Sequence, residues 1–127
     1  MSKKYETHYI VVISNRDEVE KATESQIEQA LEAIGQAAES HAVDEVTELV
    51  YDTPESPNYK RTGNLRDSIT HSEPNMTGKY VDVGSRVEYS PYVEFGTRKM
   101  KPRPFLKNAV TKYKAEYEAL AKAILSR

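Results

Sequence analysis

The sequence predicts an α+β fold, in which an antiparallel sheet of three to four strands is packed by a long N-terminal helix and a C-terminal helix. Three patterns support this prediction. Residues 9–13 form a short β-branched apolar run, and residues 80–89 carry apolar side chains at alternating positions. Residues 19–50 and the residues after 104 instead repeat apolar side chains at spacings of three and four, as amphipathic helices do.

The N-terminal part begins with the predicted strand at residues 9–13, which we expect to be buried. Asn15 can cap the helix that follows, because Glu18 stands three residues later as in a capping box. From 19 to 50 there is no proline, and a helix of this length would extend on the order of 50 Å. It would therefore either bend at Gly35 or project from the domain. Its apolar stripe consists of Ile27, Leu31, Ile34, Ala38, Ala42, Val46 and Leu49.

One side of this helix carries only small side chains, because alanines occupy positions 30, 33, 37, 38 and 42. Another helix can approach closely there. Ordinary core packing explains the pattern, and so does a helix from the next copy of the chain.

The middle of the chain alternates loops with short strands. Residues of about 52–64 contain two prolines and a glycine, which predicts an exposed loop. Residues 65–71 are expected to form a strand and residues 72–78 a polar turn. In the strand predicted at 80–89, Gly84 suggests a bulge or a close backbone contact.

A short helical turn is predicted after Ser90, because a serine cap is followed by proline in the first helical position. Gly96 would end it by taking a positive φ. Residues of about 97–104 form a predicted basic loop, since two prolines exclude a regular helix. The C-terminal helix follows, with apolar positions at Leu106, Val110, Tyr113, Tyr117, Leu120 and Ile124.

Several functional classes have no support in the residues. The 127 residues fit one domain, residues 1–127, and with no cysteine there is no disulfide, thiolate zinc site or cysteine nucleophile. The three histidines are not at recognised ligand spacings, and no nucleophile elbow or phosphate-binding glycine pattern occurs. We therefore expect no enzyme, metal or cofactor. The apolar runs are too short for a membrane span and no secretion signal is recognisable, which predicts a cytoplasmic protein.

Charge is distributed unevenly along the chain. Residues 1–56 carry 13 acidic and 4 basic side chains, net −9, whereas residues 57–127 carry 7 acidic and 14 basic side chains, net +7. Two solvated helix faces of different sign would explain this. Attraction between opposite faces of neighbouring copies would explain it too.

The basic loop is the candidate contact surface, through Arg98, Lys99, Lys101 and Arg103. These side chains suit nucleic-acid phosphates, the acidic helix of a neighbouring copy, or solvent alone. Nine tyrosines are compatible with an interface and equally with a small core that lacks tryptophan.

Two segments resemble the small tail-component family of long-tailed bacteriophages, typified by gene product ten of a lambdoid coliphage. They are Thr62-Gly63-Asn64-Leu65-Arg66-Asp67-Ser68-Ile69 and Tyr92-Val93-Glu94-Phe95-Gly96-Thr97-Arg98-Lys99-Met100 running into Pro102-Arg103-Pro104-Phe105-Leu106. The intervening strand at residues 80–84 is also similar. The resemblance covers residues 60–110, and the segment at residues 1–14 does not match it. That segment would add an edge strand or pair with a neighbouring subunit.

The resemblance implies a structural virion-assembly protein without catalysis. It implies a subunit for tail completion or head–tail joining, acting at the neck of a phage or prophage as a homo-oligomeric ring of six copies. Its partners would be other neck, connector or tail proteins, with assembly in the cytoplasm of the bacterial host and a final place in the virion neck or tail. The alternative is a nucleic-acid-binding module that uses the basic loop and nearby tyrosines. Within the motif, Glu94 and Arg98 are spaced i, i+4 and would pair if the helical turn continued, and Phe105 would anchor the last helix.

Overall fold

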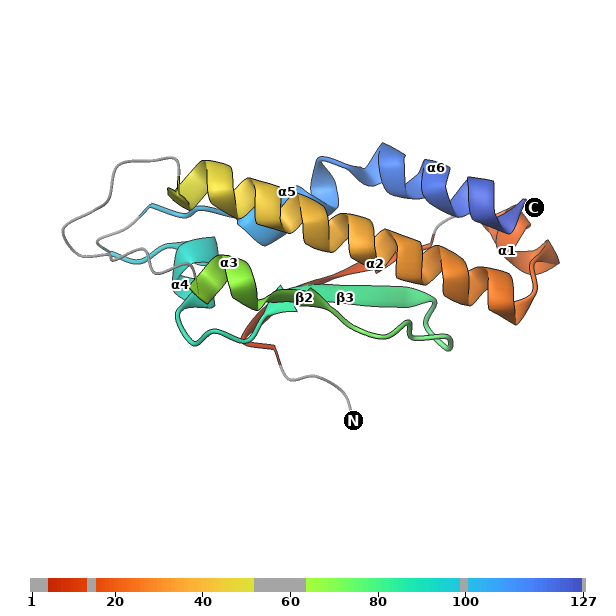
Figure 1. Cartoon of the computed structure of the whole chain (residues 1–127), viewed down its shortest axis with the longest axis horizontal. Helices are drawn as coiled ribbons and strands as arrows, with labels where there is room; N and C mark the ends of the chain where they lie inside the picture. The colour runs from red at the N-terminus through yellow and green to blue at the C-terminus, as the bar shows by residue number, and fades with distance from the viewer. Residues whose placement is uncertain (1–4, 14–15, 52–63, 99–100, 127) are drawn as a thin grey trace.

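The computed structural model describes residues 5–13, 16–51, 64–98 and 101–126 (Figure 1). It confirms the predicted α+β class. Three strands form one sheet, and the helices lie mainly on one side of it. The elements in chain order are β1 (Thr7–Val12), α1 (Arg16–Lys21), α2 (Glu24–Val46), a π-helical turn (Thr47–Tyr51), α3 (Asn64–Ser68), β2 (Ile69–His71), β3 (Tyr80–Ser85), α4 (Ser90–Phe95), α5 (Phe105–Thr111) and α6 (Lys114–Leu125).

The sheet has the order β1-β3-β2, and both pairings are antiparallel. In the register, Val11 lies opposite Val81, and Thr70 lies opposite Gly84. No bulge interrupts the pairing at Gly84. The predicted close contact is present, because a Cβ at this glycine would lie 2.4 Å from the carbonyl oxygen of Thr7. Glycine therefore allows β1 and β3 to run side by side.

The long helix is confirmed, but its start was predicted wrongly. A break at residues 22–23 separates α1 from α2, and Thr23 caps α2. The Thr23 hydroxyl accepts from the Gln26 amide at 3.2 Å, and the Gln26 side chain accepts from the Thr23 amide at 2.8 Å. This reciprocal capping box starts α2 at Glu24, whereas the prediction placed the start of the long helix directly after Asn15. The predicted Asn15 cap lies outside the described residues.

α2 continues through Gly35 without interruption. A Cβ on Gly35 would lie 2.6 Å from the His71 ring and 3.1 Å from Val81. The missing side chain lets the sheet approach α2 closely. The predicted apolar stripe is confirmed: from Ile27 to Val46 its residues are buried, and Leu49 packs against the core.

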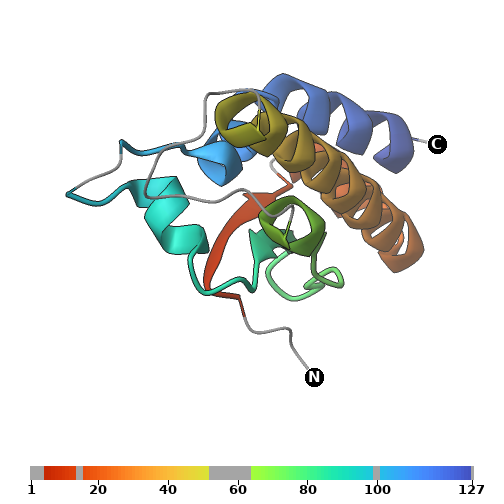
Figure 2. The same cartoon turned by 60° about the vertical axis from the view of Figure 1, so that its left-hand side comes forward.

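The alanines of α2 pack within the same chain: Ala30, Ala38 and Ala42 are fully buried, and Ala33 and Ala37 lie against the core. α2 packs against α5 and α6 as well as against the sheet, and Figure 2 shows α2 and α6 side by side. The C-terminal segment forms two helices rather than the single predicted one, because the helix is interrupted at Lys112 and Tyr113. Across this break, the Tyr117 hydroxyl donates to the Ala109 carbonyl at 2.5 Å, and Phe105 is fully buried as predicted.

Three strand predictions need correction. Residues 64–68 form helix α3, so the strand predicted at 65–71 is shortened to β2. The strand predicted at 80–89 ends at Ser85, where the Ser85 hydroxyl accepts from the Val87 amide at 3.2 Å. The first strand is buried on one face only: Val11 and Ile13 are buried, whereas Ile10 and Val12 are 47% and 52% exposed. The predicted loop at about 52–64 lies outside the described residues, except for Asn64.

Candidate functional site

The basic loop connects α4 to α5 at one end of the molecule, away from α1 and the C-terminal end of α6 (Figure 1). Arg98 and Lys101 are exposed and Arg103 is half-buried. Lys99 lies outside the described residues. None of the three described cations forms an ion pair with another described residue. Their charge is therefore not used by another described side chain.

Backbone hydrogen bonds hold the two ends of the loop together. The Arg103 amide donates to the Val93 carbonyl at 2.7 Å, and the Phe105 amide donates to the Arg103 carbonyl at 2.8 Å. On the other side, Gly96 ends α4 with the predicted positive φ, 80°. The loop leaves and returns at fixed points because both of its ends are bonded.

A buried carboxylate also connects α4 to the start of α5. Glu94 is 2% exposed, and its two oxygens accept from the backbone amides of Leu106 at 2.9 Å and Lys107 at 3.2 Å. The Tyr9 hydroxyl also bonds to it. Glu94 on α4 therefore caps the N-terminus of α5, across the loop. The condition for a pair between Glu94 and Arg98 is not met, because Gly96 ends the helix, and Glu94 bonds to α5 instead.

Burial sets the protonation behaviour of this carboxyl. It raises the pKa of Glu94, and the two backbone hydrogen bonds and the bond from Tyr9 lower it by less. The hydroxyl of Tyr9 also has a raised pKa, chiefly because it is partly buried.

Sequence reasoning missed this cap, although one signal was available. α5 follows Pro104, and no Ser, Thr, Asp or Asn stands at that position to satisfy the first amides of the helix. Because unsatisfied helix amides are costly when buried, a cap from elsewhere in the chain was required. The sequence did not indicate that Glu94 supplies it.

Two exposed aromatic side chains lie next to the loop. Tyr92 and Phe95 are 59% and 62% exposed, whereas Val93 between them is buried. A spacing of three places both rings on one face of α4. Ser90 attaches this short helix to the sheet, because its hydroxyl donates to the Thr7 hydroxyl at 3.1 Å. Exposed aromatic rings beside arginine are typical of the centres of protein interfaces.

Opposite charge lies along α2. From Glu24 to Tyr51 the chain has no lysine or arginine, and its exposed or half-buried acids are Glu24, Glu28, Glu32, Glu39, Asp44 and Glu48. Part of this charge is used within the chain. His71 bonds to Glu32 at 2.8 Å and to Glu39 at 3.0 Å.

A lysine–glutamate ion pair also joins the two oppositely charged halves of the sequence. Lys112 lies 2.9 Å from the buried carboxylate of Glu45, and this close carboxylate raises the pKa of Lys112.

The other histidines are also paired with carboxylates rather than grouped. His8 bonds to Asp82 at 2.8 Å, and His41 bonds to Glu116 while its ring stacks on Tyr113. Within the described ranges, no group of three or more His, Asp or Glu side chains is arranged to hold a metal ion. Among the same residues, no helix is both long and apolar enough to cross a membrane.

A family model described as "Bacteriophage HK97-gp10, putative tail-component" matches residues 11–96 of the chain. The match runs from the second half of β1 to the glycine that ends α4, so it includes the first motif segment and the start of the second. It ends just before the basic loop. No curated protein and no solved structure gives a significant match.

Proposed function

The chain belongs to the HK97-gp10-like family of bacteriophage tail components, and on that premise we propose that it completes the tail or joins head to tail at the neck. The role is structural. The protein assembles in the cytoplasm of the bacterial host and remains in the virion, in contact with other neck, connector or tail proteins.

The observation that carries this proposal is the bonding that connects the two described ends of the basic loop. A surface used for assembly is more effective when its side chains are held before binding, because less conformational entropy is lost on contact. The loop is held by the Val93–Arg103 hydrogen bond and by the Glu94 cap on α5. Arg98, Lys101 and the two exposed rings of α4 are therefore presented together.

The acidic side of α2 on a neighbouring copy is the proposed counterpart of this loop. Such a contact is heterologous, because different surfaces of the two copies meet, and heterologous contacts close into rings when the rotation allows. Six copies, as the family resemblance implies, would form the ring. The charge asymmetry between residues 1–56 and 57–127 then orders the copies head to tail.

A phage carrying an inactivated copy of the gene tests the role. We expect filled heads and separate or unfinished tails in electron micrographs of the lysate, and a return of infectious particles when the wild-type gene is supplied. Supplying the double variant Arg98→Glu and Lys101→Glu should not restore them. Lys122→Glu on α6 is the control, because Lys122 is also an exposed lysine but lies far from the loop, and this variant should restore them. Normal particles without the gene would refute the neck role.

One observation also favours nucleic-acid binding as a second candidate. Tyr92 and Phe95 are exposed beside Arg98, an arrangement that suits stacking of bases on rings with phosphates on cations. Binding to random single-stranded DNA should then weaken steeply between 50 and 200 mM salt, as counterion release requires. Absence of binding at about 50 mM salt rules out this candidate and leaves the structural proposal intact.

A further inference from the structure

β1 has the composition of a central strand but lies at the edge of the sheet. Its residues 9–13 are all apolar or aromatic, so both of its faces are apolar, as in strands that are covered on both sides. In the described sheet it pairs only with β3. Edge strands are usually protected by lysine, proline or a bulge, and none of these occurs between Thr7 and Val12.

The register shows which backbone groups are left on the outer edge. The Ile13 amide donates to the Lys79 carbonyl at 3.1 Å, so the odd-numbered residues of β1 bond to β3. The amides and carbonyls of His8, Ile10 and Val12 therefore point away from β3. Within the described ranges, these groups have no backbone partner. An ordered set of donors and acceptors is thus open for a further strand.

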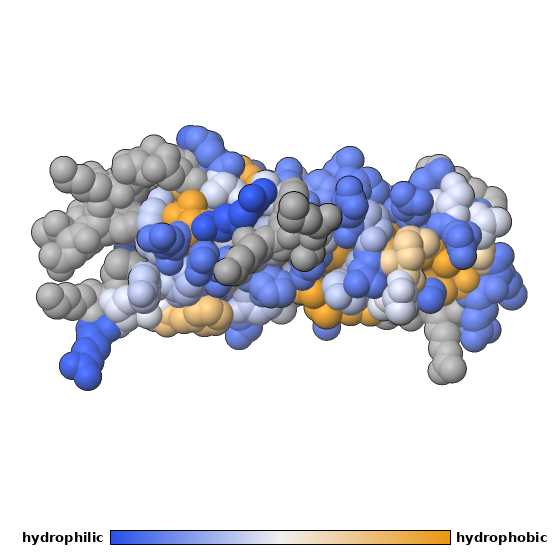
Figure 3. All heavy atoms as spheres, turned by 90° about the horizontal axis from the view of Figure 1, so that it is seen from below, coloured by the Kyte–Doolittle hydropathy of each residue, from blue (hydrophilic) through white to orange (hydrophobic). Residues whose placement is uncertain are grey.

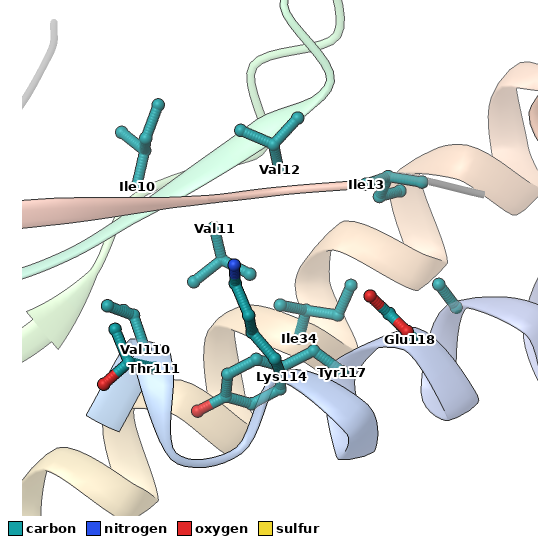
Figure 4. Close-up of a pocket in the computed structure, with 11 residues that line it drawn as sticks. Ile10, Val11, Val12, Ile13, Ile34, Val110, Thr111, Lys114, Tyr117 and Glu118 are labelled. Carbon is teal, nitrogen blue, oxygen red and sulfur yellow. The ribbon is translucent and has the colours of Figure 1, made fainter. Parts of the chain in front are cut away.

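A groove accompanies this open edge. It has a volume of about 340 Å³ and lies between β1 and the α5–α6 segment, with Val11, Ile34, Tyr117 and Ala121 in its lining. Figure 4 shows the Val11 side chain pointing to the helices, whereas Ile10 and Val12 point to the other side of the strand. On that other side, apolar atoms are exposed (Figure 3). A strand added next to β1 would cover apolar surface on both faces of the sheet.

We propose that the edge of β1 pairs with the β1 edge of a second copy of this chain. The occupant must be an extended strand, because the open groups alternate along a strand and a helix has no free backbone groups to match them. Among the described strands, β3 is paired on both sides and β2 is only three residues long, whereas β1 offers three outward residues.

The β1 edge is also complementary to itself. In an antiparallel pair centred on Ile10, His8 of each copy lies opposite Val12 of the other, and the two Ile10 side chains lie opposite each other. All three pairs have outward backbone groups, so every open donor meets an acceptor. Tyr9 of one copy then lies beside Val11 of the other, over the groove. This contact is distinct from the proposed contact of the basic loop and does not depend on the phage role.

Light scattering on the full chain tests the pairing. In high salt, where assembly through the charged loop is screened, the wild type should rise from 14.4 kDa to twice this mass as its concentration increases into the hundreds of micromolar. Ile10→Lys and Ile10→Glu each place like charges opposite each other at the centre of the pair. Because Ile10 is exposed in the monomer, both variants should fold, which circular dichroism checks. Each alone should remain a monomer, and an equimolar mixture should dimerise again.

Dimer formation in the mixture is specific to this register. Only a contact that places residue 10 of one copy opposite residue 10 of the other replaces repulsion between like charges with attraction between opposite charges. Three results would overturn the proposal: a wild type that stays monomeric at every concentration, single variants with wild-type mass, or a mixture that remains monomeric. Dimers that dissociate with salt would also overturn it, since they would indicate the charged loop instead.

Discussion

The cap that Glu94 provides to α5 gives the sharpest quantitative prediction. Glu94→Ala removes the acceptors of two backbone amides, at 2.9 and 3.2 Å, and of the Tyr9 hydroxyl. Loss of a helix cap costs about 1 kcal/mol, and each buried donor left without a partner costs about 1–3 kcal/mol more. The cost of burying the carboxylate, which its raised pKa reveals, disappears in the variant and offsets part of this. A net loss of about 2–3 kcal/mol of unfolding free energy is expected at neutral pH.

Urea unfolding followed by circular dichroism measures this loss. With a slope of about 1–3 kcal/mol/M for a small protein, the midpoint should fall by about 0.7–3 M while the slope stays constant. Limited trypsin digestion adds a local measurement: cleavage after Arg98 should accelerate, because the loop has lost one of its two connections. Glu88→Ala is the control, since Glu88 is exposed in the turn before α4. A loss below about 0.5 kcal/mol with unchanged cleavage would refute the role assigned to Glu94.

Three further predictions concern stability. Gly35→Ala should lower the free energy of unfolding, measured by urea unfolding, by about 1–2 kcal/mol, because the new Cβ would lie 2.6 Å from the His71 ring. This loss outweighs the better helix propensity of alanine. A stabilised variant would contradict the close approach of the sheet to α2. Thr23→Ala should cost about 1 kcal/mol and leave the Gln26 amide uncapped, whereas Thr23→Ser should be nearly neutral. Finally, the folded-state pKa of Glu94 is raised above 4.5, so the folded protein binds the proton more tightly than the unfolded chain. The stability that Glu94 contributes is full below pH 4.5 and is lost as pH rises through the folded-state pKa. The difference in unfolding free energy between wild type and Glu94→Gln should therefore fall as pH rises over that window. A difference that rises with pH would contradict the raised pKa.

Local patterns predicted much of the fold. The apolar stripe of α2, the turn at Gly96, the close contact at Gly84 and the burial of Phe105 follow from periodicity, backbone sterics and chain punctuation. The residues at which helices and strands begin and end were less predictable. The capping box at Thr23 competes with the equally plausible cap at Asn15, and the sequence does not show which of them starts the long helix.

Features that depend on tertiary contacts were not predictable. Glu94 has a possible partner four residues away in Arg98, and only the folded chain shows that the amides of α5 bind it instead. The composition of residues 9–13 predicts a buried strand. Its position at the edge of the sheet follows from the strand order, which local patterns do not determine.

The central claim is that the basic loop mediates assembly through charge. Its most direct test is the mass of the protein by light scattering at low protein concentration, where edge pairing is weak, over a range of salt concentrations. The account predicts an assembly larger than a dimer at low salt, which dissociates as salt rises and is absent in the folded double variant Arg98→Glu and Lys101→Glu. An assembly that is indifferent to salt and keeps its mass in this variant would contradict it.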